Sequence, residues 1–136
     1  MTMDEPIRIG IAGFGNVGVE VTRRLNAGAI PNVMVAAVTA RDLISARKRA
    51  ALLTPSPDVV PLAELPDFCD IVVESATADA LPEIARVVLA AGKQLTIVSA
   101  AGLLQFPDAE AFARAHRAKV RLCSGALPGR DILRCA

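Results

Sequence analysis

Aromatic residues and net charge are both scarce in this sequence. Its 136 residues include four Phe but no Tyr or Trp, and 15 basic against 14 acidic side chains give a formal net charge of +1. Proteins that bind nucleic acids neutralise phosphates with clustered Lys and Arg, and many stack bases on aromatic rings. Because neither feature is present, we predict no nucleic-acid partner.

Long apolar runs are also missing, although 53% of the residues are hydrophobic and the mean hydropathy is +0.44. A charged residue, Gly or Pro interrupts every apolar stretch well before the ~18 residues that a membrane-spanning helix needs. At the start of the chain, Asp4 and Glu5 stand where a signal peptide would carry basic residues. We therefore predict a protein without a membrane partner, located in the cytoplasm.

Cysteine and the common catalytic signatures are sparse as well. Cys69, Cys123 and Cys135 are odd in number and widely spaced, which fits neither a disulfide framework nor a metal site. We therefore predict buried or incidental thiols and no metal. The sequence has no GxSxG, HExxH or Walker lysine motif. Its lone histidine, His116, lies in a predicted helix far from the predicted strand ends, so we expect a structural role for it.

What the sequence does have is an alternation of short β-branched runs with longer stretches rich in Ala, Leu and Arg. This pattern is typical of repeated βαβ units around a parallel sheet. No linker interrupts it, so we predict one α/β domain over residues 1–136, a Rossmann-type doubly wound parallel sheet. The predicted strands are residues 7–12, 33–39, 59–60, 70–74, 95–98 and 120–123. The predicted helices are residues 16–27, residues 43–53, a helix that has Pro82 in its first turn and ends at Gly92, and a helix that follows Asp108 and runs to about residue 117.

Local signals support two details of the predicted helices. Asp42 and Asp108 each precede a helical stretch and are predicted to cap it. Val17, Val21 and Leu25 recur every four residues, which predicts that they share the buried face of the first helix.

A glycine motif, Gly13-Phe14-Gly15-Asn16-Val17-Gly18, separates the first predicted strand from the first helix. In this position Gly13 permits a tight turn, Gly15 lets main chain approach a pyrophosphate, and Gly18 lets the helix pack closely on the strand. The helix N-terminus supplies free N–H groups, so no basic side chain is needed there. The motif predicts a dinucleotide site formed by all six residues; three glycines that merely serve a turn are the alternative.

The second predicted strand ends without the acid that binds the adenosine ribose of NAD in many enzymes. The stretch reads Val38-Thr39-Ala40-Arg41-Asp42, and Asp42 comes late enough to be better explained as the helix cap. We therefore favour NADP, or use of both NADP and NAD, with Arg41 and Thr39 at the 2′ position. A solvent-exposed surface charge is an equally good interpretation of Arg41.

Ligands of doubly wound sheets lie beyond the carboxyl ends of the strands, which directs attention to residues 74–77, 99–102 and 124–129. These residues are mostly small, so a nicotinamide and its ribose could lie against main chain. The candidates for the cofactor site here are Ser75, Ala76, Thr77 and Ser99. For Glu74, hydrogen bonds to a ribose, hydrogen bonds to neighbouring N–H groups, and a cap or ion pair all stay open.

Four segments together resemble the aspartate dehydrogenase family, and the resemblance covers nearly the whole chain. They are Ile9-Gly10-Ile11-Ala12-Gly13-Phe14-Gly15-Asn16-Val17-Gly18, Asp70-Ile71-Val72-Val73-Glu74-Ser75-Ala76, Val98-Ser99-Ala100-Ala101-Gly102-Leu103 and Ser124-Gly125-Ala126-Leu127-Pro128-Gly129-Arg130-Asp131. The last resembles the family's Ser-Gly-Ala-Ile-Gly-Gly-x-Asp stretch. The family oxidises L-aspartate to iminoaspartate with NAD or NADP in NAD biosynthesis, and the resemblance implies that Ala126 contacts the cofactor. Pro128 replaces a family glycine and Arg130 adds bulk beside it.

Family members continue into a second α/β domain that carries substrate-binding residues and a catalytic histidine, whereas this sequence ends at Ala136. We expect an amino-acid substrate only if such a domain is supplied, because no residue here suits both substrate binding and proton transfer. The chain is then a fragment or truncated reading frame, or another polypeptide completes it. If a domain is missing, Leu127, Ile132 and Leu133 should form an uncovered patch, and the chain should self-associate as a homo-oligomer.

Two other interpretations stay open. Homoserine dehydrogenase is the nearest rival family and would suit the glycine motif, but it expects an Asn-Lys pair where Ala100 and Ala101 follow Ser99. The second alternative is a dinucleotide-binding module without catalysis that senses the nucleotide or regulates a partner.

Overall fold

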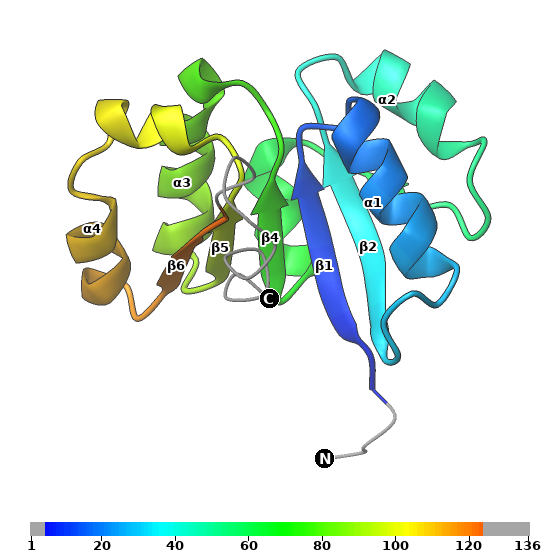
Figure 1. Cartoon of the computed structure of the whole chain (residues 1–136), viewed down its shortest axis with the longest axis horizontal. Coiled ribbons are helices and arrows are strands. Elements are labelled where there is room, and N and C mark those ends of the chain that lie inside the picture. The colour runs from blue at the N-terminus through cyan, green and yellow to red at the C-terminus, as the bar shows by residue number, and fades with distance from the viewer. Residues whose placement is uncertain (1–4, 124–136) are drawn as a thin grey trace.

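The computed structural model describes residues 5–123, which form one parallel sheet with helices on both faces (Figure 1). The strands are Ile7–Ala12 (β1), Val33–Thr39 (β2), Asp58–Val59 (β3), Ile71–Glu74 (β4), Gln94–Ile97 (β5) and Lys119–Leu122 (β6). The α-helices are Asn16–Asn26 (α1), Leu43–Ala50 (α2), Leu81–Ala90 (α3) and Ala109–Ala115 (α4). Short 3-10 helices span Leu62–Phe68 (η1), Ala78–Ala80 (η2) and Ala100–Gln105 (η3).

The strand order is β3-β2-β1-β4-β5-β6, and every adjacent pair is parallel. This is the order of a Rossmann-type sheet, in which the chain reverses its direction of travel across the sheet between β1 and β4. The predicted fold class is therefore confirmed.

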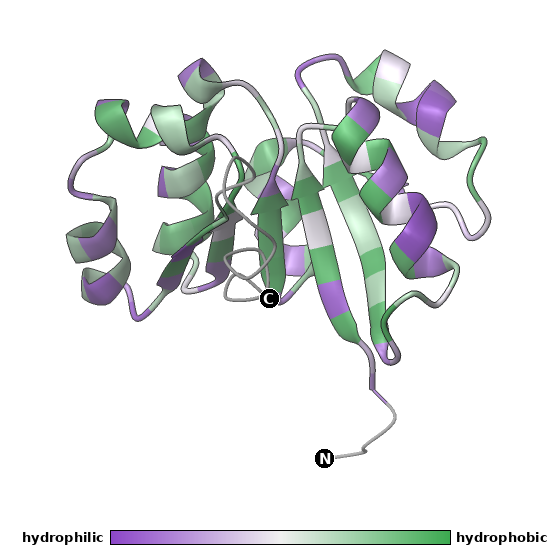
Figure 2. Ribbon diagram, viewed as in Figure 1, coloured by the Kyte–Doolittle hydropathy of each residue, from purple (hydrophilic) through white to green (hydrophobic). Residues whose placement is uncertain are grey.

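Two apolar cores lie on opposite faces of the sheet. One core joins η1, α3 and α4 to inward side chains such as Val72 and Leu95, and the other joins α1 and α2 to Ile9, Ile11 and Val35. In Figure 2 the central strands β1, β2 and β4 are mostly green, while α1 and α2 alternate green with purple, as expected for helices that bury one side only. Both cores therefore fix the carboxyl ends of β1 and β4 from opposite sides.

The predicted elements match the observed ones within a few residues, but two details were wrong. Val17 is 55% exposed. The buried positions of α1 are Gly18 and Thr22, because one step along a helix turns a side chain by about 100° and moves Val17 to the edge of the packed face. Asp108 occupies the N-cap position of α4 but makes no capping hydrogen bond through its side chain.

The second helix also ends earlier than predicted. α2 stops at Ala50, and residues 51–53 continue only as turns, with Leu52 N–H bonded to Arg49 O and Leu53 N–H bonded to Ala50 O. Leu52 is 85% exposed, so packing of its side chain adds nothing to a further helical turn, although Leu53 still packs against the core. The sequence patterns did not predict the three 3-10 helices.

Candidate functional site

A cleft of about 810 Å³ opens at the carboxyl ends of the strands, where the strand order reverses between β1 and β4. Segments far apart in the sequence form it: the loop after β1, the end of β2 with one face of α2, the start of η1, the loop after β4 with η2, and the first turn of α3. The lining residues are Gly13, Phe14, Gly15, Thr39, Ala40, Arg41, Asp42, Leu43, Ser45, Ala46, Arg49, Pro61, Leu62, Ser75, Ala76, Thr77, Asp79, Ala80, Glu83 and Ile84.

The loop after β1 has the conformations that the glycine motif predicts. Gly13 has a φ of +101°, and a Cβ there would lie 2.6 Å from the backbone nitrogen of Ala76. A Cβ on Gly18 would lie 2.5 Å from the carbonyl oxygen of Gly13. A Cβ on Gly15 would meet nothing within 4 Å, so the main chain there is bare toward the cleft. The structural roles predicted for Gly13 and Gly18 are confirmed.

The N-terminus of α1 is free of side-chain caps. Gly15 is the N-cap residue, no side chain accepts a hydrogen bond there, and the first turn carries no acid. The first N–H groups of a helix lack intrahelical partners and lie at the positive end of its dipole. These groups can receive an anion from the cleft. Asn16 and Val17 are exposed, and neither residue belongs to the cleft lining. What they offer a ligand that lies beside Gly15 is their main-chain N–H groups.

Phe14 has its side chain inside the protein and its main chain at the cleft. The ring is 2% exposed and packs in the core beneath α1 and α2. Its carbonyl oxygen accepts a hydrogen bond of 2.7 Å from Nη1 of Arg49, a residue of α2. The glycine loop is thereby joined to α2.

The end of β2 brings Thr39 and Arg41 to the same cleft, as predicted. Thr39 is 5% exposed, and its carbonyl oxygen accepts the N–H of Gly13 at 2.9 Å. Asp42 caps α2, because its Oδ1 accepts the N–H of Ser45 at 3.1 Å. The interpretation of Asp42 as a helix cap is confirmed.

Glu74, at the end of β4, is completely buried and organises the loops beside it. Its Oε2 accepts the N–H of Ala76 at 2.8 Å, and its Oε1 accepts the N–H groups of Val98 and Ser99 at 3.1 and 2.8 Å. Of the roles left open for Glu74, hydrogen bonding to neighbouring N–H groups is the one observed. The buried carboxyl of Glu74 therefore stabilises the conformations of the loops after β4 and β5.

Hydroxyl groups complete this network. Ser75 Oγ donates to the carbonyl oxygen of Gly13 at 2.7 Å, and Ser99 Oγ donates to that of Ala76 at 2.6 Å. Ser75, Ala76 and Thr77 line the cleft, whereas Ser99 does not. Ser99 thus stabilises the loop after β4 through the hydrogen bond from its hydroxyl to Ala76.

The comparisons with known proteins agree with this geometry. Residues 13–123 match the family model described as the NAD-binding domain of homoserine dehydrogenase. The chain belongs to this family of NAD-binding domains. L-aspartate dehydrogenase 3 of Bordetella bronchiseptica is 35% identical over 136 residues, which are 100% of this chain and 50% of that protein. L-aspartate dehydrogenase of Methanocella arvoryzae is 33% identical over 95% of this chain and 48% of that protein.

These relatives confirm the predicted resemblance to aspartate dehydrogenases, and the chain spans about half of their length. The crystal structure of GenD2 from gentamicin A biosynthesis, in complex with NAD, superimposes with a TM-score of 0.71. It is 21% identical and covers 90% of this chain and 35% of that chain. The chain is thus an NAD-binding domain of the oxidoreductase type, with the dinucleotide NAD(P) as its cofactor.

Other predicted residues of this NAD-binding domain lie away from the cleft. His116 is exposed after α4, with Nδ1 2.9 Å from the carbonyl oxygen of Phe112, in agreement with a structural role. Cys69 is buried, and burial raises the pKa of its thiol to about 11. Ala126 and Cys135 lie outside the described residues.

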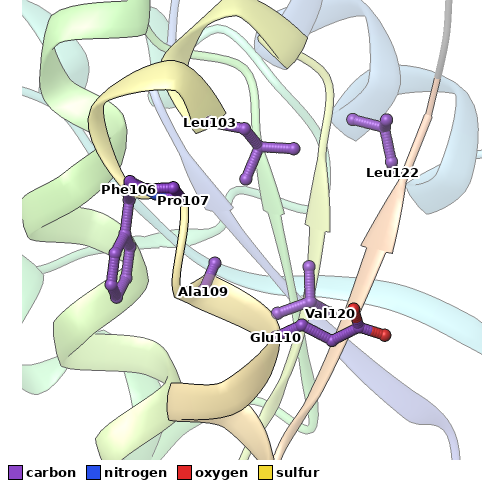
Figure 3. Close-up of a pocket in the computed structure, with 7 residues that line it drawn as sticks. All are labelled: Leu103, Phe106, Pro107, Ala109, Glu110, Val120 and Leu122. Carbon is purple, nitrogen blue, oxygen red and sulfur yellow. The ribbon is translucent and has the colours of Figure 1, made fainter.

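A second cavity, of about 300 Å³, lies between η3, α4 and β6 (Figure 3). Its lining residues are Leu103, Phe106, Pro107, Ala109, Glu110, Val120 and Leu122. Glu110 is the one ionisable residue in this lining, so the cavity offers no cluster of catalytic groups. Within residues 5–123, no group of three His, Cys, Asp or Glu side chains could hold a metal, and no helix is long and apolar enough to cross a membrane.

Arg49 is the main residue that the sequence analysis missed. It lies 35 positions after Phe14, and no short motif connects the two residues. A signal did exist, because Asp42, Ser45, Ala46 and Arg49 have the spacing of one helix face.

Proposed function

We propose that this chain is the cofactor-binding domain of an oxidoreductase similar to aspartate dehydrogenase, which oxidises L-aspartate to iminoaspartate in NAD biosynthesis. One observation carries the proposal: the bare main chain of Gly15, which is the N-cap of α1 and has no side-chain capping hydrogen bond, lines a cleft large enough for a dinucleotide. The nicotinamide would accept the hydride from the substrate.

In this proposal the glycine loop, residues 13–18, receives the pyrophosphate on its N–H groups. Gly13 fits against Ala76 too closely for any side chain, so the loop keeps its shape and leaves the space beside Gly15 open. The loop of Ser75, Ala76 and Thr77, held by Glu74 and Ser99, then faces the nicotinamide half. Ala126 is proposed as a further cofactor contact on the resemblance alone.

NADP is the proposed preference, with NAD as an alternative cofactor. Support comes from Arg41, which lines the cleft at the end of β2, and from Asp42, whose Oδ1 is occupied by the cap of α2. A ribose hydroxyl would need a free acceptor at this place, whereas a 2′-phosphate needs a cation.

Substrate binding and proton transfer are proposed to come from a second domain. The one histidine of the sequence, His116, does not line the cleft. We further propose that residues 1–136 form a single domain that acts in the cytoplasm, without nucleic-acid or membrane partners, and that it self-associates.

Calorimetric titration of the chain with NADP and NAD tests the proposal. We expect saturable binding of one dinucleotide per chain, and folded protein that binds neither would contradict it. Arg41→Asp should weaken NADP binding at least about tenfold more than NAD binding, because it places a carboxylate against the 2′-phosphate. Equal losses for both nucleotides would remove Arg41 from the 2′ position.

The reaction itself is tested by the change in nicotinamide absorbance when L-aspartate is added to the protein with its complementing domain. L-homoserine serves as the control amino acid. Reduction of the nucleotide with L-homoserine but not with L-aspartate would favour the rival family, and binding without reduction by either would favour a non-catalytic module.

A further inference from the structure

One face of α2 forms a wall of the dinucleotide cleft. Asp42, Ser45, Ala46 and Arg49 follow the i, i+3, i+4, i+7 spacing of a single helix face, and all four line the cleft. The two basic residues between them, Arg47 and Lys48, do not line it. Position on the helix therefore distinguishes Arg49 from its basic neighbours.

The guanidinium of Arg49 is held in place but has unused donors. Its Nη1 donates to the carbonyl oxygen of Phe14, whose ring is fixed in the core, so the acceptor end of this contact is anchored. A guanidinium carries five N–H donors. Among the residues that the structure describes, this bond is the one that Arg49 makes, and no carboxylate pairs with it. The side chain is exposed, so its other donors are accessible to a ligand.

Charge is distributed unevenly across the cleft. Arg41 and Arg49, with the hydroxyl-bearing Ser45, lie on the α2 side, whereas Asp79 and Glu83 lie on the α3 side. The acid on the α2 side, Asp42, uses Oδ1 to cap its own helix. Two guanidinium groups and a hydroxyl that line the same side of the cleft suit a phosphate monoester, which offers several acceptor oxygens and close to two negative charges.

We propose that Arg49 is a second cation of the subsite for the ribose 2′-phosphate and determines specificity for NADP together with Arg41. The inference rests on the proposed function, because it presumes a dinucleotide whose pyrophosphate lies on the glycine loop. Phe14 O holds the guanidinium beside the loop, and the free N–H donors bind the phosphate when it arrives. Arg49 is thus a binding residue contributed by tertiary structure, since α2 must pack beside the loop for it to reach the site.

The test compares Arg49→Gln and Arg49→Lys with the unmodified chain in calorimetric titrations. Four probes separate the parts of the ligand: NADP and 2′,5′-ADP carry the 2′-phosphate, whereas NAD and ADP do not. We expect Arg49→Gln to raise the dissociation constants of NADP and 2′,5′-ADP about tenfold and those of NAD and ADP less than about twofold. Arg49→Lys keeps the charge and should fall in between.

Arg47→Gln is the matched control, because it removes the same charge from the same helix at a position outside the cleft. It should leave all four dissociation constants within about twofold, so that a change in net charge alone is excluded. Thermal unfolding of each variant shows that it is folded.

Three outcomes overturn the inference. If Arg49→Gln weakens all four probes equally, Arg49 only holds the glycine loop. If it weakens none, the side chain does not touch the ligand. If Arg47→Gln has the same effect as Arg49→Gln, the interaction is long-range electrostatics. A folded, unmodified chain that binds none of the probes would instead overturn the proposed function itself.

Discussion

Two loops meet at the cleft and are held in different ways. The loop after β1 takes its shape from glycine: Gly13 adopts a φ of +101° and Gly15 leaves its main chain open. The loop after β4 has no glycine, and the buried carboxyl of Glu74 and the hydroxyls of Ser75 and Ser99 fix it through hydrogen bonds. The first loop owes its conformation to its own glycines, although Thr39, Ser75 and Arg49 also form hydrogen bonds with it. The second loop depends on a network that also includes the loop after β5.

This difference shows why one loop is easier to recognise in a sequence than the other. A backbone position with positive φ favours glycine at that position, so the sequence motif itself reveals the conformation of the loop. The buried carboxyl of Glu74 accepts three main-chain N–H groups, one of them from Ser99, which lies 25 residues later in the chain. Almost every residue type carries a main-chain N–H group, so the sequence near Glu74 needs no particular residue to form these bonds. Substitutions in the two loops should therefore lower the free energy of unfolding for different reasons: a backbone clash in the first loop and lost hydrogen bonds in the second.

The largest effect is expected at Gly13. Gly13→Ala adds a Cβ 2.6 Å from the backbone nitrogen of Ala76, at a φ that disfavours side chains, and should reduce the free energy of unfolding by about 3 kcal/mol. Gly15→Ala, its matched control, adds a methyl in open space and should change stability by less than about 0.5 kcal/mol while weakening dinucleotide binding. Urea unfolding and calorimetry measure both; equal stability of the two variants would contradict the local account of this loop.

Glu74→Gln should have the next largest effect. The amide offers one acceptor oxygen where the carboxyl offers two, and its NH₂ group would face N–H donors in a fully buried place. We expect a loss of about 2 kcal/mol in urea unfolding, because buried donors lose their partners. Ser99→Ala removes only the hydrogen bond to Ala76 and should lose about 1 kcal/mol. A Glu74→Gln variant as stable as the unmodified chain would show that the network does not hold the second loop.

The smallest effect is expected at the other end of the same two strands, where Asp70 before β4 accepts hydrogen bonds from the backbone N–H and the guanidinium of Arg8 in β1. These contacts, the backbone bond first, hold the pKa of the Asp70 carboxyl below its usual value. A carboxyl with a lowered pKa stabilises the fold above its unfolded pKa, and this stability is lost as the pH falls through the folded pKa.

Asp70→Asn should therefore lower the free energy of unfolding at neutral pH by about 0.5 kcal/mol, a small amount because both side chains are nearly half exposed. The difference should disappear in acid, and dinucleotide affinity should not change, since this contact lies far from both loops. Unfolding curves measured across the acid range check the sign. A stability difference that grows as the pH falls would contradict it.

Much of the fold could be predicted because the relevant signals are local. β2 is a nearly continuous apolar run and was predicted with its observed bounds, and Asp42 was recognised as the cap of α2 from its position. Val17 was placed wrongly because apolar spacing does not state which edge of a helix meets the sheet. The early end of α2 was missed because the exposed Leu52 is apolar in sequence but has nothing to pack against.

The sequence by itself determined the glycine loop, the order of strands and helices, and the relation to NAD-binding oxidoreductases, since backbone conformation and periodicity depend on neighbouring residues. Tertiary structure alone decided that Glu74 supports the second loop and that Arg49 reaches Phe14. Both depend on which side chains meet after the sheet has formed, because hydrogen-bond partners 25 or 35 residues apart leave no periodic pattern in the chain.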